Sequence, residues 1–462
     1  MSVVGAIMVP HPPIILPEVG RGEERKISAT DEAYRKAAAF VGSLKPETIV
    51  LLSPHSVMYA DYFHISPGRS ARGDMRQFRA PQVQIEVSYD SAFVKNLANA
   101  ASSAGLPAGT LGERNPELDH GTIIPLYYIN QYYTGYQLVR IGLSGLPLTD
   151  HVRLGQLILQ TADSLDRRTV IVGSGDLSHK LREDGPYGLS KEGPEYDKRI
   201  MYVMGRAAFD ELLDFDEVFC DKAAECGHRS FCIMAGALDG LSVETQRLSH
   251  EGTFGVGYGV CTYRVTGRDP SGSCLDSWRE RQKKNLEEKR RKEDAYVRLA
   301  RASVCSWVGE GKRLVLPGDL PAEMMEKQAG VFVSLHKDGR LRGCIGTIQA
   351  VRKNIAEEIV ENGISAATKD PRFSPVLPEE LELLEISVDV LGKPEKIRSK
   401  DELDVKKYGV IVTKGFRRGL LLPNLDGVES VDEQLSIALR KAGLSEREKN
   451  FEMERFEVVR HV

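Results

Sequence analysis

The sequence predicts an α/β domain followed by an α+β domain, and three observations lead to this fold class. The chain has 462 residues, which is long for one hydrophobic core and typical of two or three domains. Strand and helix patterns alternate at the start, with a strand over 3–9, a helix over 27–43 and a strand over 48–52. This order favours a mostly parallel sheet flanked by helices. From residue 295 onward strands and helices follow without regular alternation, which is typical of an α+β domain.

Hydrophobic periodicity and helix-breaking residues indicate the elements of the first domain. The helix over 27–43 carries Ala, Tyr and Phe at helical spacing and stops at Leu44-Lys45-Pro46. The β-branched run Val170-Ile171-Val172 suits a buried strand that Gly173 ends. The polar stretch 61–88 is expected to be a long surface excursion, of the kind that often forms a lid. Further elements are expected as helices over 91–104, 151–165 and 231–241, a strand over 137–143, and a closing strand pair over 253–265.

A change in composition at Gly267 divides the chain. We expect a first domain over 1–266, a charged linker helix over 267–294 and a second domain over 295–462. The linker opens with the turn-forming Asp269-Pro270-Ser271-Gly272-Ser273. Its glutamates and lysines then interleave at helical spacing, which indicates a solvated helix rather than a nucleic-acid-binding segment. The second domain is expected to contain helices over 295–307, 354–367 and 431–442 and strands over 330–335, 384–391 and 409–413.

The composition argues against several classes of protein. Hydrophobic residues at 41% and charged residues at 28% are typical of a globular protein, and a net charge of −4 gives no attraction to nucleic acid or an anionic membrane. The sequence shows no apolar run long enough to span a bilayer and no signal peptide. Its seven cysteines are scattered without a CxxC pair, which argues against a disulfide framework and favours a cytoplasmic, reducing compartment. The sequence leaves the oligomeric state open, and a homo-oligomer is compatible with it.

Three of the expected strands end at a histidine. His11 and His55 follow the first two strands, and His179 follows the strand over 170–172. Ligands bind where the carboxyl ends of parallel strands meet, so we expect these side chains to share a site. Neutral imidazole is the commonest transition-metal ligand, and His11 and His55 are therefore expected to bind one ion. A single such histidine would more often be a hydrogen-bonded loop residue, but the repetition favours a metal site.

Glu225 and Cys226 are both candidates for the third metal ligand. Glu225 would complete a face of two histidines and one carboxylate, which leaves positions on Fe(II) open for substrate and dioxygen. Cys226 would instead supply a thiolate and shift the choice of metal towards zinc or copper.

His179 and His120 are candidates for catalysis. Asp176 lies one short turn before His179, and a carboxylate that accepts the Nδ1 proton raises the basicity of the other ring nitrogen. We therefore expect His179 to be the acid–base residue; alternatively, Asp176 caps the turn that follows it. His120, which follows Asp119, is expected to contact a substrate hydroxyl, and a place in a surface turn is equally compatible with the sequence.

Five motifs around these residues resemble a known family when taken in order. They are Pro10-His11-Pro12, Ser53-Pro54-His55, Asp119-His120-Gly121, Gly175-Asp176-Leu177-Ser178-His179 and Glu225-Cys226-Gly227. Residues 1–266 are thereby similar to the class III extradiol ring-cleaving dioxygenases (LigB-like) and to their relatives, the Memo proteins.

The resemblance implies that His11, His55 and a glutamate bind non-haem Fe(II), that His179 is the acid–base catalyst and that His120 contacts the substrate. It further implies that a catecholate and dioxygen bind the iron together and that the ring opens next to its hydroxyls. The chain departs from this pattern at the third ligand, because Cys226-Gly227 is similar to the Memo version, in which a cysteine takes that place. We favour Glu225. If Cys226 were the ligand, the resemblance would favour metal storage or redox chemistry over ring cleavage.

Residues 295–460 resemble the AMMECR-type domain. The match rests on Leu341-Arg342-Gly343-Cys344-Ile345-Gly346, Phe373-Ser374-Pro375-Val376 and Arg418-Gly419-Leu420-Leu421-Leu422-Pro423. The fusion of both modules resembles the AmmeMemoRadiSam system, which implies a radical-SAM enzyme as a partner. Cys344 lies in a glycine-flanked turn where Arg340 and Arg342 would stabilise a thiolate, but a small buried cysteine in a tight turn is the favoured interpretation.

Three hypotheses for function follow. The leading one is an Fe(II)-dependent extradiol-type dioxygenase that acts with dioxygen on a catechol-like, vicinal dihydroxy aromatic substrate. The second is a non-catalytic metal-binding adaptor that works with a radical-SAM enzyme. The third is a zinc-dependent hydrolase at the same strand ends. In the leading hypothesis the C-terminal domain is expected to bind a small molecule or a partner.

Overall fold

A computed structural model describes residues 2–269, 273–337, 339–425, 427–446, 448 and 450–462. The chain forms two compact units, residues 1–281 and 282–462. Helix α9 (Cys274–Lys292) covers most of the charged run, whereas residues 270–272 of the expected turn lie outside the described residues. Among the helices of the described residues, none combines the length and the apolar character that a membrane crossing requires.

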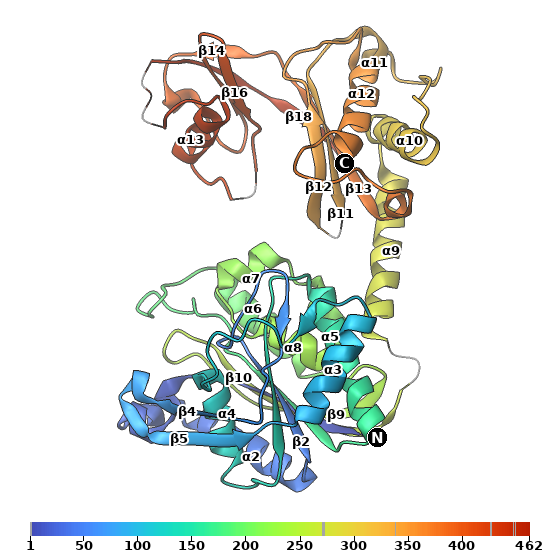
Figure 1. The fold of residues 1–462 in the computed structure, drawn as a ribbon. Helices are drawn as coiled ribbons and strands as arrows, with labels where there is room; N and C mark the ends of the chain where they lie inside the picture. The colour runs from blue at the N-terminus through green and yellow to red at the C-terminus, as the bar shows by residue number, and fades with distance from the viewer. Residues whose placement is uncertain (1, 270–272, 338, 426, 447, 449) are drawn as a thin grey trace. The chain divides into compact units, whose positions relative to one another are not determined.

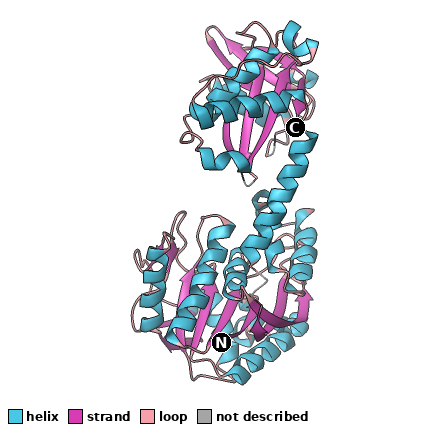
Figure 2. Ribbon diagram, turned by 90° about the vertical axis from the view of Figure 1, so that its right-hand side faces the viewer, coloured by secondary structure: helices cyan, strands magenta, loops and turns pink. Residues whose placement is uncertain are grey.

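The N-terminal unit is built on a six-stranded sheet with the order β7-β2-β8-β1-β10-β9 (Figures 1 and 2). Four neighbouring strands are parallel: β7 (Gln137–Gly142), β2 (Thr48–Ser53), β8 (Thr169–Ser174) and β1 (Val3–Val9). The edge beside β1 is an antiparallel hairpin of β10 (Tyr258–Arg268) and β9 (Leu241–Glu251). The predicted α/β class with a mostly parallel sheet is confirmed.

Helices bury both faces of this sheet. One face packs against α2 (Ser28–Leu44) and α4 (His120–Ile129), and the other against α3 (Ser91–Ser103), α5 (Leu148–Leu165) and α8 (His228–Ala237). Along β2, Ile49 and Leu51 belong to the first core, and Val50 and Leu52 to the second. Because both faces are covered, the strand is apolar at every position between its ends, as is usual in parallel sheets. The unit also contains α1 (Pro17–Gly20), α6 (Glu192–Met204), α7 (Glu217–Ala223), β3 (Phe63–His64) and β6 (Ala108–Gly109).

The structure adds to one expectation for this unit and corrects another. Within the polar stretch 61–88, β4 (Ser70–Met75) and β5 (Ala80–Ser88) form an antiparallel hairpin, because alternate residues of β5 are buried under a polar outer face. The closing strand pair is not contained in 253–265. Its first strand is β9, in which most side chains are polar and half-exposed, so that the sequence shows no clear alternation. The helix expected over 231–241 ends at Ala237.

The C-terminal unit contains two antiparallel sheets, and the predicted α+β class is confirmed. The first sheet has the order β12-β11-β13-β18 and packs against α10 (Ala295–Glu310) and α12 (Ile355–Thr368). The second has the order β14-β17-β15-β16 and packs against α13 (Val431–Lys441). The remaining elements are α11 (Ala322–Glu326), β11 (Val331–Lys337), β12 (Arg340–Gly346), β13 (Leu384–Leu391), β14 (Glu395–Ile397), β15 (Gly409–Lys414), β16 (Arg417–Leu421), β17 (Glu452–Phe456) and β18 (Val458–His461).

Candidate metal centre

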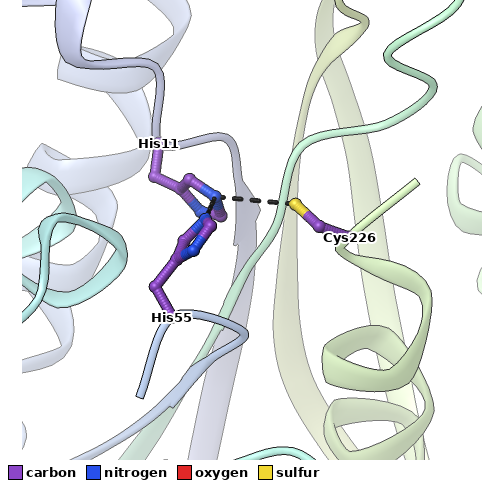
Figure 3. Close-up of side chains that lie close together, drawn as sticks. All are labelled: His11, His55 and Cys226. Carbon is purple, nitrogen blue, oxygen red and sulfur yellow. Dashed lines mark hydrogen bonds between the residues drawn. The ribbon is translucent and has the colours of Figure 1, made fainter. Parts of the chain in front are cut away.

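Three side chains from distant parts of the sequence converge at the carboxyl edge of the parallel strands (Figure 3). His11 follows β1, His55 follows β2, and Cys226 lies in the turn before α8. The Nε2 atoms of His11 and His55 are 3.0 Å apart, and the Sγ of Cys226 is 3.6 Å from the Nε2 of His11. One donor atom from each residue lies within 4.8 Å of the other two.

These separations suit donors that share one transition-metal ion. Metal–nitrogen bonds of about 2.0–2.1 Å and metal–sulfur bonds of about 2.3 Å place neighbouring ligands roughly 3–3.6 Å apart around an ion. Two imidazoles and a thiolate are donors that zinc, copper and iron accept. The residues therefore fit a mononuclear metal site with three protein ligands.

Ser174 orients the His11 ring. The Ser174 hydroxyl donates its only proton to the Gly121 carbonyl at 2.7 Å, while its Oγ lies 2.9 Å from the Nδ1 of His11. Ser174 must therefore accept a hydrogen bond from Nδ1–H, which leaves the Nε2 lone pair of His11 directed towards His55 and Cys226. Burial, together with the nearby His55, lowers the pKa of His11 well below its ordinary value and keeps the ring neutral.

Replacing Ser174 with alanine is expected to lower the affinity for Zn(II) about tenfold, because His11 loses the contact that selects its tautomer. Competition titration against a chromophoric chelator measures the change. Ser56→Ala is the matched control, since the Ser56 hydroxyl has no hydrogen-bond partner among the described residues. An affinity unchanged in Ser174→Ala would show that the serine does not orient the ligand.

A series of hydrogen bonds holds His55 and leads to the helix that begins at His120. The His55 backbone N–H donates to the Ser53 hydroxyl at 3.2 Å, and Ser53 donates to the Asp119 carboxylate at 2.5 Å. Asp119 also caps α4 by accepting from the Thr122 N–H at 3.0 Å. His120 begins that helix, and its ring centroid lies 4.0 Å from that of His55. Asp119 therefore ties the second metal-ligand candidate to the expected substrate-contacting histidine.

Burial keeps both of these imidazoles neutral. It lowers the pKa of His55, and together with the neighbouring His55 it lowers the pKa of His120 to about 4. The sequence reasoning missed Ser53 and Ser174. Both are the last residues of their strands, and a hydroxyl at that position was the available signal.

Cys226 is held against the turn that follows β8. Its Sγ accepts a hydrogen bond from the Asp176 N–H at 3.3 Å, and the Gly227 N–H donates to the Asp176 carbonyl at 3.1 Å. Burial raises the pKa of the Cys226 thiol well above its ordinary value. Metal coordination would remove that proton, because a bound cation stabilises the thiolate directly.

Glu225 does not join this group of donor atoms. Its carboxylate accepts a hydrogen bond from the His228 N–H at 2.6 Å, and His228 is the first residue of α8. The carboxylate thus satisfies one of the free N–H groups at the start of that helix. Burial raises the pKa of Glu225 to about 7. Our preference for Glu225 as the third ligand is therefore not supported by the geometry, which favours Cys226.

The expected hydrogen bond between Asp176 and His179 is not formed. The Asp176 carboxylate instead accepts from the His11 N–H at 2.7 Å, and burial raises its pKa to about 7. The Nδ1 of His179 is buried without a hydrogen-bond partner among the described residues. The His179 ring faces Tyr187 edge-on, with centroids 5.2 Å apart. Burial lowers the pKa of His179, which leaves a neutral imidazole close enough to His11 to influence its pKa.

Comparison with known proteins identifies both domains. Residues 5–261 match the family model of the catalytic LigB subunit of aromatic ring-opening dioxygenase, and residues 297–461 match the AMMECR1 family. A protein of Clostridium acetobutylicum is 40% identical over 469 residues, which covers 100% of this chain and 99% of that protein. A protein of Thermotoga maritima is 50% identical over 170 residues, 37% of this chain and 98% of its own length.

Two solved structures are also similar to parts of the chain. An uncharacterised protein of Pyrococcus horikoshii has 33% sequence identity and a TM-score of 0.34, covering 36% of this chain and 88% of that one. An uncharacterised protein of Escherichia coli K12 has 17% identity and a TM-score of 0.38, covering 56% of this chain and 99% of that one. On the evidence of the family models and the full-length relative, this chain belongs to the family of the catalytic LigB subunit of aromatic ring-opening dioxygenase, and it carries an AMMECR1 domain after that module.

Proposed function

We propose that the N-terminal domain is a metal-dependent dioxygenase that acts on a small vicinal dihydroxy aromatic. The observation that carries the proposal is the convergence of His11, His55 and Cys226 on one point, with His120 and His179 beside it. Fe(II) is the proposed metal, and when bound it would supply Lewis-acid and redox chemistry towards dioxygen and the substrate oxygens.

The chain's own residues would bind the substrate and move its protons. His179 is neutral and lies close to His11, so it is suited to take a proton from a substrate hydroxyl and to return it later. His120 is suited to hydrogen-bond the second hydroxyl. Phe78 lies edge-on to His120 with centroids 5.2 Å apart, and Tyr187 takes the same position beside His179. These two rings would favour an aromatic substrate.

One observation favours a second candidate. The third candidate donor is the sulfur of Cys226 rather than a carboxylate. Bound as a thiolate, it would suit zinc or copper better than Fe(II). In this second proposal the same centre makes the chain a metal-binding adaptor for a radical-SAM enzyme, and zinc or copper takes the place of iron.

A catechol panel separates the two candidates. The whole protein is loaded anaerobically with one equivalent of Fe(II) and then exposed to air with a series of catechols, while dioxygen uptake and ring-opened chromophores are recorded. The dioxygenase proposal expects uptake with iron and none with zinc. His179→Gln is expected to slow turnover about 100-fold without changing the iron content, because only proton transfer is lost. Stoichiometric iron without uptake for any catechol would contradict the enzyme and support the adaptor.

A further inference from the structure

The C-terminal unit contains a cavity of about 1200 Å³ that the function of the metal centre does not use. Its walls come from β11, β12 and β13 on one side, from β16 and α13 on the other, and from the end of α9. Apolar side chains from both sides form much of the surface, namely Phe332, Leu341, Ile348, Leu420 and Ile437. A volume of this size and an apolar lining suit a small organic molecule.

Two cations meet at this cavity beside a thiol. Arg372 follows α12 and Lys441 ends α13, and both line the cavity together with Cys344 of β12. Cys344 is half-buried, and its Sγ accepts a hydrogen bond from the Ser334 hydroxyl at 3.2 Å. Desolvation lowers the pKa of Lys441, whereas Cys344 raises that pKa and Arg372 lowers it.

Most other cations around the cavity are neutralised within the protein. Lys289 pairs with Glu385 at 2.5 Å, Arg460 with Asp389 at 2.7 Å, and Arg418 with Glu454 at 3.1 Å. Arg372 itself pairs with Asp370 at 2.7 Å.

Lys441 differs from these side chains, since the described residues offer it no ion pair or hydrogen bond. Its ammonium lines the same cavity as Arg372 and Cys344, and a bound anion would supply the partner that it lacks.

We propose that this cavity binds a small organic anion whose carboxylate or phosphate lies between Lys441 and Arg372, beside Cys344, and whose apolar body lies against Phe332, Leu341 and Ile437. The apolar walls supply affinity that a bare inorganic ion would not gain, and the unpaired ammonium of Lys441 selects against a neutral molecule of the same shape. The proposal is independent of the metal centre, because every residue it uses belongs to 282–462.

Protection of Cys344 measures binding directly. The full-length protein is treated with 2,2′-dithiodipyridine, a neutral aromatic disulfide. The Cys344 sulfur forms a mixed disulfide with one pyridine, and the second half leaves as 2-thiopyridone with the thiol proton. Peptide mass mapping follows Cys344 separately from the other cysteines. The probes 2-naphthoate, 2-naphthyl phosphate and the neutral 2-naphthamide are compared for the concentration that halves the rate.

We expect at least one of the two anions to protect Cys344 at about a tenfold lower concentration than the amide, and their ranking distinguishes a carboxylate from a phosphate ligand. Lys441→Gln should raise the protecting concentration of that anion about tenfold and leave the amide unchanged. Lys441→Arg should retain protection. Arg440→Gln, the adjacent residue on α13 outside the cavity, is the matched control.

Three results would overturn the proposal. One is equal protection by anions and amide, the second is protection that survives Lys441→Gln unchanged, and the third is a Cys344 that does not react. Failure to react would show that the cavity does not admit an aromatic molecule of this size.

Discussion

Replacing Cys226 with alanine is expected to lower the affinity of the protein for Zn(II) or Fe(II) about 1,000-fold. Structural zinc sites bind with roughly 12 kcal/mol shared among their ligands, so the loss of one of three ligands costs about 4 kcal/mol. His11 and His55, whose Nε2 atoms lie 3.0 Å apart in the unchanged protein, are the ligands left in this variant, and two imidazoles alone hold an ion weakly. Metal content after anaerobic purification and competition titration both measure the effect.

Glu225→Gln is the matched variant at the adjacent position. Glutamine has nearly the same shape and keeps an oxygen that accepts from the His228 N–H, so the start of α8 is preserved. We expect Glu225→Gln to bind metal within about threefold of the unchanged protein, since Glu225 lies outside the donor group. The reverse pattern, with metal lost in Glu225→Gln and kept in Cys226→Ala, would restore the two-histidine, one-carboxylate site and overturn the geometry described above.

The positions of the histidines could be predicted because they depend on strand ends alone. A β-branched run followed by Pro, Gly or Ser marks where a buried strand stops, and parallel strands all stop at one edge of the sheet. His11 and His55 therefore meet although 43 residues separate them. The same argument places His179 near them.

The choice between Glu225 and Cys226 could not be predicted, since it depends on how one short turn meets α8. The Glu225 carboxylate accepts a hydrogen bond from a free N–H group at the start of that helix, and the Cys226 thiol faces His11. The hydrogen-bond partner of Asp176 could not be predicted either. Its carboxylate accepts from the backbone N–H of His11, which is 165 residues away in the sequence. Strands β9 and β17 were missed for a related reason, as their half-exposed side chains carry little hydrophobic pattern.

The position of Cys226 depends on contact between two glycines. Gly175 follows β8 and Gly227 precedes α8, and a Cβ added to Gly175 would lie 2.1 Å from the Cα of Gly227. Ordinary contacts begin near 3.4 Å, so an alanine at 175 must push the turn away by more than 1 Å. Metal–ligand distances tolerate only about 0.2 Å. We therefore expect Gly175→Ala to weaken metal binding by about 100-fold or more, although every ligand side chain is still present.

The same clash should lower the free energy of unfolding of the metal-free protein by about 1–3 kcal/mol, as overpacking of a buried contact does. Zinc titration and urea unfolding without metal measure the two effects separately. Gly267→Ala is the control, because the nearest atom to a Cβ at that position lies 3.9 Å away. If Gly175→Ala lost stability but kept its metal affinity, the position of Cys226 would not depend on this contact. If both quantities fell, the close approach of the two turns would account for how a residue 215 positions from His11 becomes its co-ligand.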